Sequence, residues 1–296
     1  MIEFGHGTHT GLRREHNEDT YCADPDMGLW LVADGMGGHE HGEVASALAR
    51  DVVIREVHKG QALANAIQSA DEEIIRHSNE KRSERPMGTT VVAAMVHDGR
   101  RAYIANVGDS RLYLARKDCA HALTEDHTLI AAQIKSGQLA REDAGRSPFK
   151  GVLTRALGQH ESVQVDTLVV DLLPGDRLML CSDGLWSSVA DAQIAEFLGT
   201  RPISDAVPEL AEQALRNAGP RSDNVTLLAV EFEGAEGSTA APAVSTRALG
   251  DEVFASTIQA SLTPGDANSD DLDEAEIERS IREINEAIRR SSQKKS

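Results

Sequence analysis

The hydrophobic positions of this chain fall into short runs that are separated by glycine, aspartate and asparagine, and into longer stretches where apolar residues recur at helical spacing. Short apolar runs bounded by turn residues predict buried strands, and helical spacing predicts amphipathic helices. We expect strands at residues 20–23, 28–34, 88–97, 101–107, 111–116, 163–172, 177–182 and 225–232. We expect helices at residues 42–58, 60–79, 128–136, 191–198 and 203–217.

The order of these elements favours an α+β fold, because strands come in runs and helices in pairs, without steady alternation. Asp98-Gly99 joins two strand-like runs and predicts a β-hairpin. A third antiparallel strand is expected at 111–116, after the turn at 108–110.

A change of composition after Phe232 predicts the domain boundaries. Residues 1–233 are expected to fold as one unit, residues 234–269 to form a flexible linker rich in small residues, and residues 270–296 to form an acidic-to-basic tail with a short helix. The tail carries a narrow isoleucine stripe, at Ile277, Ile281, Ile284 and Ile288. This stripe fits a helix that binds a partner or docks on its own domain, and the acidic composition fits a solvated, disordered tail.

Composition narrows the function classes. The apolar fraction of 40% can fill a core, and the formal net charge of −18 disfavours nonspecific binding to nucleic acid or anionic membranes. Three widely spaced cysteines argue against a disulfide framework and a zinc knuckle. No apolar stretch approaches the ~20 residues of a membrane span, and no secretory signal pattern opens the chain. We expect a cytoplasmic protein without membrane insertion.

Four aspartates lie where strand-like runs begin or end, namely Asp34, Asp109, Asp183 and Asp223. One aspartate at a strand end is ordinary turn chemistry, but four of them, each beside Gly or Asn, suggest strand ends gathered around one point. Carboxylates packed together repel and must bind protons or cations. Oxygen ligands without clustered Cys or His favour Mg or Mn over zinc.

Eight motifs contain these aspartates, lie between them or precede them, at residues 11–19, 33–39, 88–90, 106–111, 124–128, 153–158, 181–186 and 222–226. In this order and spacing the chain resembles the metal-dependent protein phosphatases, the type 2C family of Ser/Thr phosphatases, in its bacterial form. The resemblance covers roughly residues 5–232. It implies a four-layer α-β-β-α sandwich of two antiparallel sheets flanked by helices, with a metal site at one edge.

The resemblance also implies a ligand set for two Mn or Mg ions. Asp34 would bridge the ions and the backbone carbonyl of Gly35 would add a ligand, while Asp183 and Asp223 would hold the first ion. Asp19 would hold the second ion, partly through water.

Asp109, together with Asp183, would bind a third, weaker ion by the same resemblance. From its residues alone, Asp109 also fits a role in organising its own turn. Asp126 and His127 are expected to shape a loop and start a helix, and Thr89 and Thr90 to support the site.

The chemistry that the resemblance implies is direct attack on phosphorus by a water or hydroxide that bridges the two ions, without a phosphoenzyme. Asp34 and Arg14 are the expected catalytic residues, with Arg14 binding the phosphoryl oxygens. Arg14 also fits an ordinary surface ion pair, and Arg13 is an alternative clamp. Met36 stands where many eukaryotic members carry a histidine, so water, a metal-bound water or another residue must protonate the leaving group, and His39 is a candidate that is near in sequence.

Residues 137–158 form a long connection that resembles the mobile flap of bacterial relatives, and an ordinary surface excursion is the alternative. Basic residues here, Arg141, Arg146 and Lys150, suit an acidic phosphopeptide.

The sequence therefore predicts a protein serine/threonine phosphatase that acts on phosphorylated proteins and opposes a bacterial Ser/Thr protein kinase. Two alternatives are a non-catalytic phosphoprotein-binding sensor or scaffold on the same fold, and a switch phosphatase that acts on an anti-sigma-factor antagonist or a broader phosphoesterase. The full set of aspartates and the complete flap favour the general phosphatase.

Overall fold

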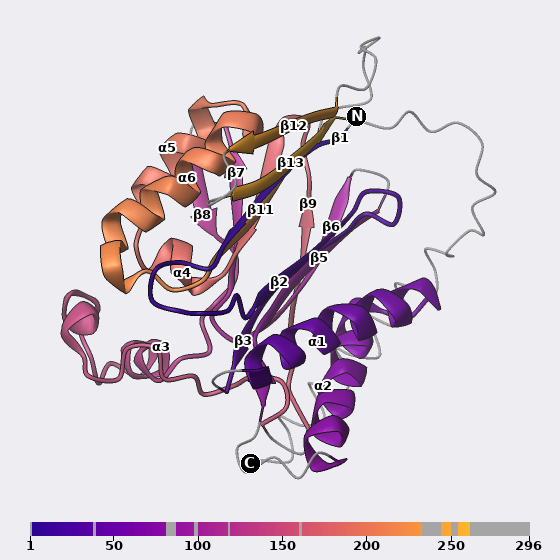
Figure 1. Ribbon diagram of the computed structural model, residues 1–296, viewed down its shortest axis with the longest axis vertical. Coiled ribbons are helices and arrows are strands. Elements are labelled where there is room, and N and C mark those ends of the chain that lie inside the picture. The colour runs from indigo at the N-terminus through magenta and orange to yellow at the C-terminus, as the bar shows by residue number, and fades with distance from the viewer. Residues whose placement is uncertain are drawn as a thin grey trace.

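The computed structural model describes residues 2–37, 40–80, 87–97, 100–117, 119–159, 162–232, 244–249 and 254–260. There the chain forms two antiparallel sheets (Figure 1). One sheet has the order β12 (Val244–Leu249), β13 (Phe254–Ala260), β1 (Ile2–His9), β11 (Val225–Phe232), β10 (Asp176–Cys181), β7 (Arg111–Arg116), β8 (Cys119–Ala122). The other has the order β2 (Asp19–Asp24), β3 (Leu29–Met36), β5 (Val91–His97), β6 (Arg101–Val107), β9 (Asp166–Asp171), with β4 (Gly88–Thr89) beside β3.

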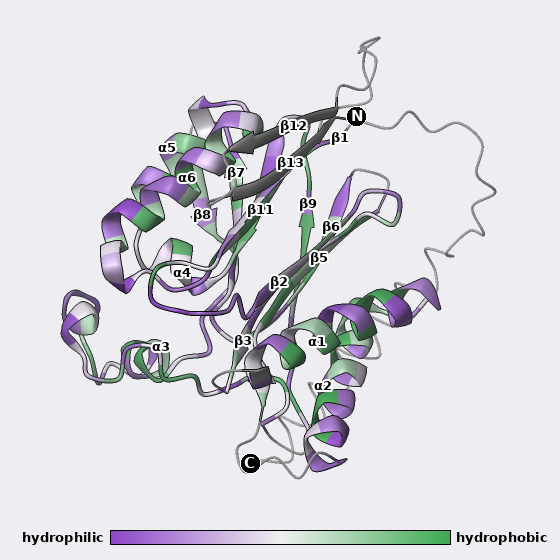
Figure 2. Ribbon diagram, in the orientation of Figure 1, coloured by the Kyte–Doolittle hydropathy of each residue, from purple (hydrophilic) through white to green (hydrophobic). Residues whose placement is uncertain are grey.

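Helices cover the outer face of each sheet. Helices α1 (Glu40–His58) and α2 (Leu63–Glu80) lie on the β2–β9 sheet, and α5 (Asp191–Thr200) and α6 (Ile203–Ala218) lie on the other (Figure 1). Short elements complete the described chain, namely α3 (Leu129–Lys135), η1 (Arg141–Arg146), α4 (Asp183–Trp186) and η2 (Gly219–Arg221). Figure 2 shows hydrophobic and hydrophilic residues on each of the four long helices, as expected for helices that cover a sheet on one side.

Three hydrophobic clusters separate the four layers, one under each helix pair and one between the sheets. Strand β3 shows how one run serves two of them. Leu29 and Leu31 face the α1–α2 layer, and Trp30 and Val32 face the opposite sheet. Because both faces are buried, the strand is apolar throughout, which is why its sequence shows no alternation. The expected α-β-β-α sandwich is confirmed.

The strand at 111–116 is present but does not extend the β5–β6 hairpin. Strand β7 pairs with β10 and β8 in the other sheet, whereas β6 pairs with β5 and β9. The segment 108–110 is therefore a crossover between the sheets, and the expected antiparallel strand at 111–116 is present but pairs in the other sheet rather than beside β6. The crossover places Asp109 at the edge where the sheets meet.

Strand β1 has no counterpart among the expected elements, although it pairs with both β11 and β13. Its sequence has glycine and histidine where strands are usually apolar. The packing explains this, since a Cβ added at Gly5 would lie 3.0 Å from Cγ2 of Ile203. Helix α6 packs directly on the strand, so a small residue is needed there.

The proposed division into a domain, a linker and a tail stays a prediction. Strands β12 and β13 lie inside the range 234–269 expected to be a linker. The tail 270–296, the Asp98-Gly99 turn and His39 lie outside the described residues. Within the described ranges, none of the helices combines the length and the hydrophobicity that a membrane span requires.

Candidate active site

Asp19 and Asp34 lie opposite each other in the β2–β3 pairing, at the end of the sandwich where β2 begins and β3 ends. The backbone of Asp34 is fixed by the next strands: its N–H donates to Thr90 Oγ1 at 3.0 Å, and its carbonyl accepts from Thr89 Oγ1 at 2.8 Å. The supporting role expected for both threonines is confirmed.

Asp109 lies on the crossover between the sheets and is 5% exposed. Its carbonyl oxygen accepts a hydrogen bond from Trp186 Nε1 at 2.9 Å. The next residue, Ser110, is hydrogen-bonded through Oγ to Thr90 Oγ1 at 2.7 Å. These contacts tie the crossover to the residue between β4 and β5 and to α4.

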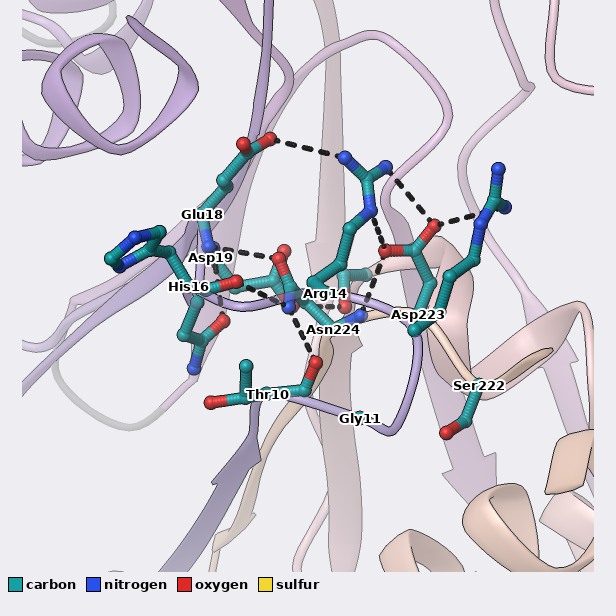
Figure 3. A network of polar contacts seen from close by, with 12 residues as sticks. Thr10, Gly11, Arg14, His16, Glu18, Asp19, Ser222, Asp223 and Asn224 are labelled. Atoms are coloured by element: carbon teal, nitrogen blue, oxygen red, sulfur yellow. Dashed lines mark hydrogen bonds and ion pairs between the residues drawn. The ribbon is translucent and has the colours of Figure 1, made fainter. Parts of the chain in front are cut away.

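Asp183 opens α4 directly after β10, and Asp223 lies just before β11. The two segments are in close contact, because a Cβ added at Gly184 would lie 2.0 Å from the carbonyl oxygen of Asn224. Asn224 also anchors the loop that carries the first motif, because its Nδ2 donates to the carbonyls of Thr10 and His16 at 2.7 and 3.0 Å (Figure 3).

Arg14 contacts the carboxylate of Asp223 with two donors. Its Nε lies 2.7 Å from Asp223 Oδ1, and its second donor lies 3.2 Å from Oδ2 (Figure 3). A weaker contact of 3.7 Å joins Arg14 to Glu18. Arg13 reaches Asp223 only at 3.9 Å and its side chain is 64% exposed. Arg14 therefore forms an ion pair, as the alternative hypothesis for this residue expected, but its partner Asp223 is one of the candidate metal ligands.

The carboxylates of this site raise one another's pKa values. Burial raises the pKa of Asp34 well above its usual value, and the charges of Asp19, Asp183, Asp109 and Asp223 raise it further. The pKa values of Asp19 and Asp109 are raised to about 7, mainly by burial, and that of Asp183 to about 6. The structure thus brings the other four aspartates within electrostatic reach of Asp34.

The described residues contain no ready-made group of three or more Asp, Glu, His or Cys side chains shaped to hold a metal ion. Two candidate ligands instead have protein partners: Asp223 binds Arg14, and Asp19 Oδ2 accepts from Ser182 Oγ at 2.7 Å. The other oxygen of Asp19 is buried without a hydrogen-bond partner. A buried orphan oxygen among carboxylates with raised pKa values fits a hard divalent cation.

Gly35 leaves room for the backbone to approach this centre closely. A Cβ there would lie 2.1 Å from the carbonyl oxygen of Gly42 and 2.7 Å from that of Glu18, both backbone atoms. The position therefore requires glycine for steric reasons.

Several residues around the site were not assigned roles from the sequence. Glu18 is 4% exposed, its amide donates to Asn224 Oδ1 at 2.8 Å, and its carbonyl accepts from Ser46 Oγ at 2.6 Å. It stands inside the first motif, between Asn17 and Asp19, so its position in that motif was the available signal. For Trp186, the only available signal was its position at the end of the motif at residues 181–186.

The segment expected to be a flap projects from the sandwich with α3 and η1 (Figure 1). Its base is held by two isolated bridges, Thr128 to Leu153 and Thr89 to Leu157. Of the three basic residues there, Lys150 acts on the site, since its charge lowers the pKa of Asp183. Arg146 instead pairs with Asp143 within the flap.

Residues 6–224 match the family model for protein phosphatase 2C. The chain is 38% identical over 238 residues to the serine/threonine phosphatase Stp of Listeria innocua serovar 6a, covering 76% of this chain and 93% of that protein. It superposes with a TM-score of 0.71 on the serine/threonine phosphatase PstP of Mycobacterium tuberculosis, at 32% identity, covering 79% of this chain and 99% of that one. A PstP catalytic domain in complex with 2 manganese ions gives a TM-score of 0.68 at 30% identity, covering 79% and 100% of the two chains.

Proposed function

The chain belongs to the protein phosphatase 2C family and is a protein serine/threonine phosphatase, and we propose that it hydrolyses phosphoserine and phosphothreonine with two Mn or Mg ions and a weaker third. The family is metal-dependent, and a related catalytic domain binds manganese. The observation that carries the proposal is the group of carboxylates around Asp34, because burial and the charges of four other aspartates raise the pKa of Asp34 well above its usual value.

These carboxylates would divide the ions among them. Asp34 and the carbonyl of Gly35 would be shared, Asp183 and Asp223 would complete one site, and Asp19 would serve the second. Asp109, with Asp183, would serve the third. Bound ions would neutralise charge on the phosphoryl oxygens and lower the pKa of the attacking water. Metal uptake would displace protons from the carboxylates, so binding should strengthen as the pH rises.

Arg14 is the residue of this chain best suited to bind the phosphoryl group. Its planar guanidinium already contacts both oxygens of a carboxylate, the geometry that also suits phosphate. Binding substrate would require Arg14 to exchange part of its contact with Asp223 for the phosphoryl oxygens. Met36 holds no proton to give, so we propose that water protonates the leaving alkoxide.

Phosphorylated proteins are the substrate class, and we propose a Ser/Thr protein kinase as the opposing enzyme. Lys150 on the flap lies near enough to Asp183 to influence its charge, which supports a role for the flap in receiving an acidic phosphopeptide. The non-catalytic alternative has no support, because the matched relatives are named phosphatases.

The test is hydrolysis of a phosphothreonine peptide by the full chain, with Mn and with excess chelator. We expect phosphate release only with Mn, and a similar rate on a phosphoserine peptide. A matched phosphotyrosine peptide should be turned over far more slowly. Absence of Mn-dependent release, or equal release in chelator, would refute the proposed metal chemistry.

A further inference from the structure

His127 lies between the crossover that carries Asp109 and residues 128–158. These comprise α3 and the predicted flap segment 137–158, and the two together are called the flap from here on. It is 7% exposed. Its backbone N–H donates to the carbonyl of Gly108 at 2.9 Å, and its ring Nδ1 accepts from the N–H of Gly108 at 3.0 Å. One residue thus binds both polar backbone groups of the glycine that precedes Asp109.

The hydrogen bond from the Gly108 N–H to Nδ1 determines which ring nitrogen of His127 carries the proton. Because Nδ1 accepts a hydrogen bond, the neutral ring carries its proton on Nε2, which then donates to Asp166 Oδ2 at 3.0 Å. Arg155 donates to the other oxygen of Asp166. These two partners lower the pKa of Asp166 to about 2, so its carboxylate stays charged and holds the ring in place. Arg155 also lies 3.1 Å from Nε2, but two donors form no hydrogen bond with each other.

Gly108 has little freedom on its other side. It adopts φ +104°, and a Cβ there would lie 2.6 Å from Cβ of Thr90. The next carbonyl, that of Asp109, is held by Trp186. His127 thus holds both peptide groups that flank Gly108. Its backbone N–H binds the peptide that leads to Asp109, and its ring binds the preceding one. The Asp109 side chain extends from this restrained backbone.

Both limbs of the flap meet at the same histidine. Thr128, the next residue, caps α3 by accepting from the N–H of Ala131 at 3.1 Å. The returning limb reaches His127 directly, since the N–H of Thr154 donates to its carbonyl at 2.8 Å. Arg155, on the same limb, fixes the partner of the ring.

We propose that His127 is a positioning residue that sets the place of the Asp109 carboxylate and links it to the flap, so that metal binding at Asp109 restrains the flap. The proposal rests on the proposed function, because it requires Asp109 to be a metal ligand.

The first measurement is calorimetric titration of the full chain with Mn, without substrate. Asparagine at 127 places an oxygen near the position of Nδ1, whereas glutamine places its amide near Nε2 and leaves the Gly108 N–H without an acceptor. We expect His127→Gln and Asp109→Asn each to weaken the weakest Mn-binding step about tenfold. His127→Asn should stay within about threefold of the wild type. The double variant Asp109→Asn/His127→Gln should bind no more weakly than Asp109→Asn.

The second measurement is chymotrypsin cleavage after Phe149, which lies on the flap and is 46% exposed. We expect Mn to slow this cleavage several-fold in the wild type and in His127→Asn. Mn should not change it in His127→Gln or Asp109→Asn. A purely structural role of the ring would change both position-127 variants alike.

Equal behaviour of the asparagine and glutamine variants, additive losses in the double variant, or cleavage that is insensitive to Mn in the wild type would each overturn the inference. If His127→Gln does not fold, His127→Ala replaces it, because it also lacks the acceptor. A wild type that binds no Mn at all would overturn the metal assignment and this inference together. A wild type that binds Mn without the contrast at position 127 would overturn this inference alone.

Discussion

Asp19 stands directly opposite Asp34 across the β2–β3 pairing, so two acidic side chains lie on the same face of the sheet at one edge. Like charges in directly opposed positions destabilise a sheet. Here Asp19 is buried and Asp34 is half-buried, and the charge of Asp19 raises the pKa of Asp34. Such a local conflict is typical of functional sites, where stability is given up for chemistry.

The first prediction concerns pH. The raised pKa values of Asp19 and Asp109, about 7, mean that the folded protein binds more protons than the unfolded chain below that pH. As the pH rises through 7 these protons are lost from the folded state alone, so the free energy of unfolding decreases. We expect the melting temperature in chelator to fall by several degrees between about pH 6.5 and 8.

The pH window of about 6.5 to 8 is needed because buried His6 has a lowered pKa. At lower pH this makes the free energy of unfolding rise with pH, opposite to the effect of the aspartates. Mn should reduce or reverse the decrease, since a bound cation stabilises the charged carboxylates. Asp34→Asn should also melt at a higher temperature than the wild type in chelator at pH 8. A metal-free melting temperature that rises over this window would contradict the assigned carboxylate cluster.

The second prediction concerns Asp34, which is expected to bridge the two ions, and Asp183, which is expected to hold the first ion. Asp34→Asn and Asp183→Asn each keep the side-chain shape, and the hydrogen bonds of Asp34 to Thr89 and Thr90 use its backbone. We expect turnover of a phosphothreonine peptide at saturating Mn to fall by at least about a hundredfold, with an unchanged far-ultraviolet circular dichroism spectrum.

A matched control is Asp171→Asn, because the Asp171 side chain is 83% exposed on the edge strand β9. It should keep full turnover. If either site variant kept both the wild-type rate and a native spectrum, that residue would have no role in the chemistry.

The sequence was sufficient for the parts of this structure where local pattern and burial agree. The β3 run is apolar because it is buried on both faces, so its end at Asp34 could be located from the sequence. The same holds for Asp183 and Asp223, which border buried strands. A family resemblance then supplied Asp19, whose neighbours are polar.

What the sequence left open is set by packing between distant segments. Whether β7 continues the β5–β6 hairpin or crosses to the other sheet depends on its partner β10, which is more than sixty residues away along the chain. The amide of Glu18 donates to Asn224, which is distant along the chain, and Gly5 of β1 is explained only by the helix that packs on it. No local pattern encodes these contacts.

The third prediction separates Arg14 from its neighbour. Arg14 contacts Asp223 with two donors, whereas Arg13 reaches it only at 3.9 Å. If Arg14 also binds phosphate, Arg14→Ala should lower kcat/KM for a phosphothreonine peptide about ten- to a hundredfold, the range for charge-assisted hydrogen bonds of ~1.5–3 kcal/mol. Arg14→Lys should recover only part of this, because an ammonium lacks the planar pair of parallel donors with which a guanidinium binds two oxygens.

Arg13→Ala is the control and should change kcat/KM less than about threefold. A loss for Arg13→Ala equal to that for Arg14→Ala would show that the pair acts only through overall charge. Measurement of KM and kcat separately over a range of peptide concentrations distinguishes weaker binding from slower chemistry.

The last prediction uses Gly35. A Cβ at this position would meet the carbonyl oxygens of Gly42 at 2.1 Å and Glu18 at 2.7 Å, and neither backbone atom can turn aside as a side chain would. Gly35→Ala should therefore lower the free energy of unfolding by about 1–3 kcal/mol and move the Gly35 carbonyl away from the site. Mn affinity, measured by calorimetry, should fall with it.

Gly145→Ala is the control, because nothing lies within 4 Å of its added Cβ, and it should change neither quantity. A Gly35→Ala protein with wild-type stability and Mn affinity would mean that α1 and β3 can separate at this point, and the carbonyl would lose its place among the proposed ligands.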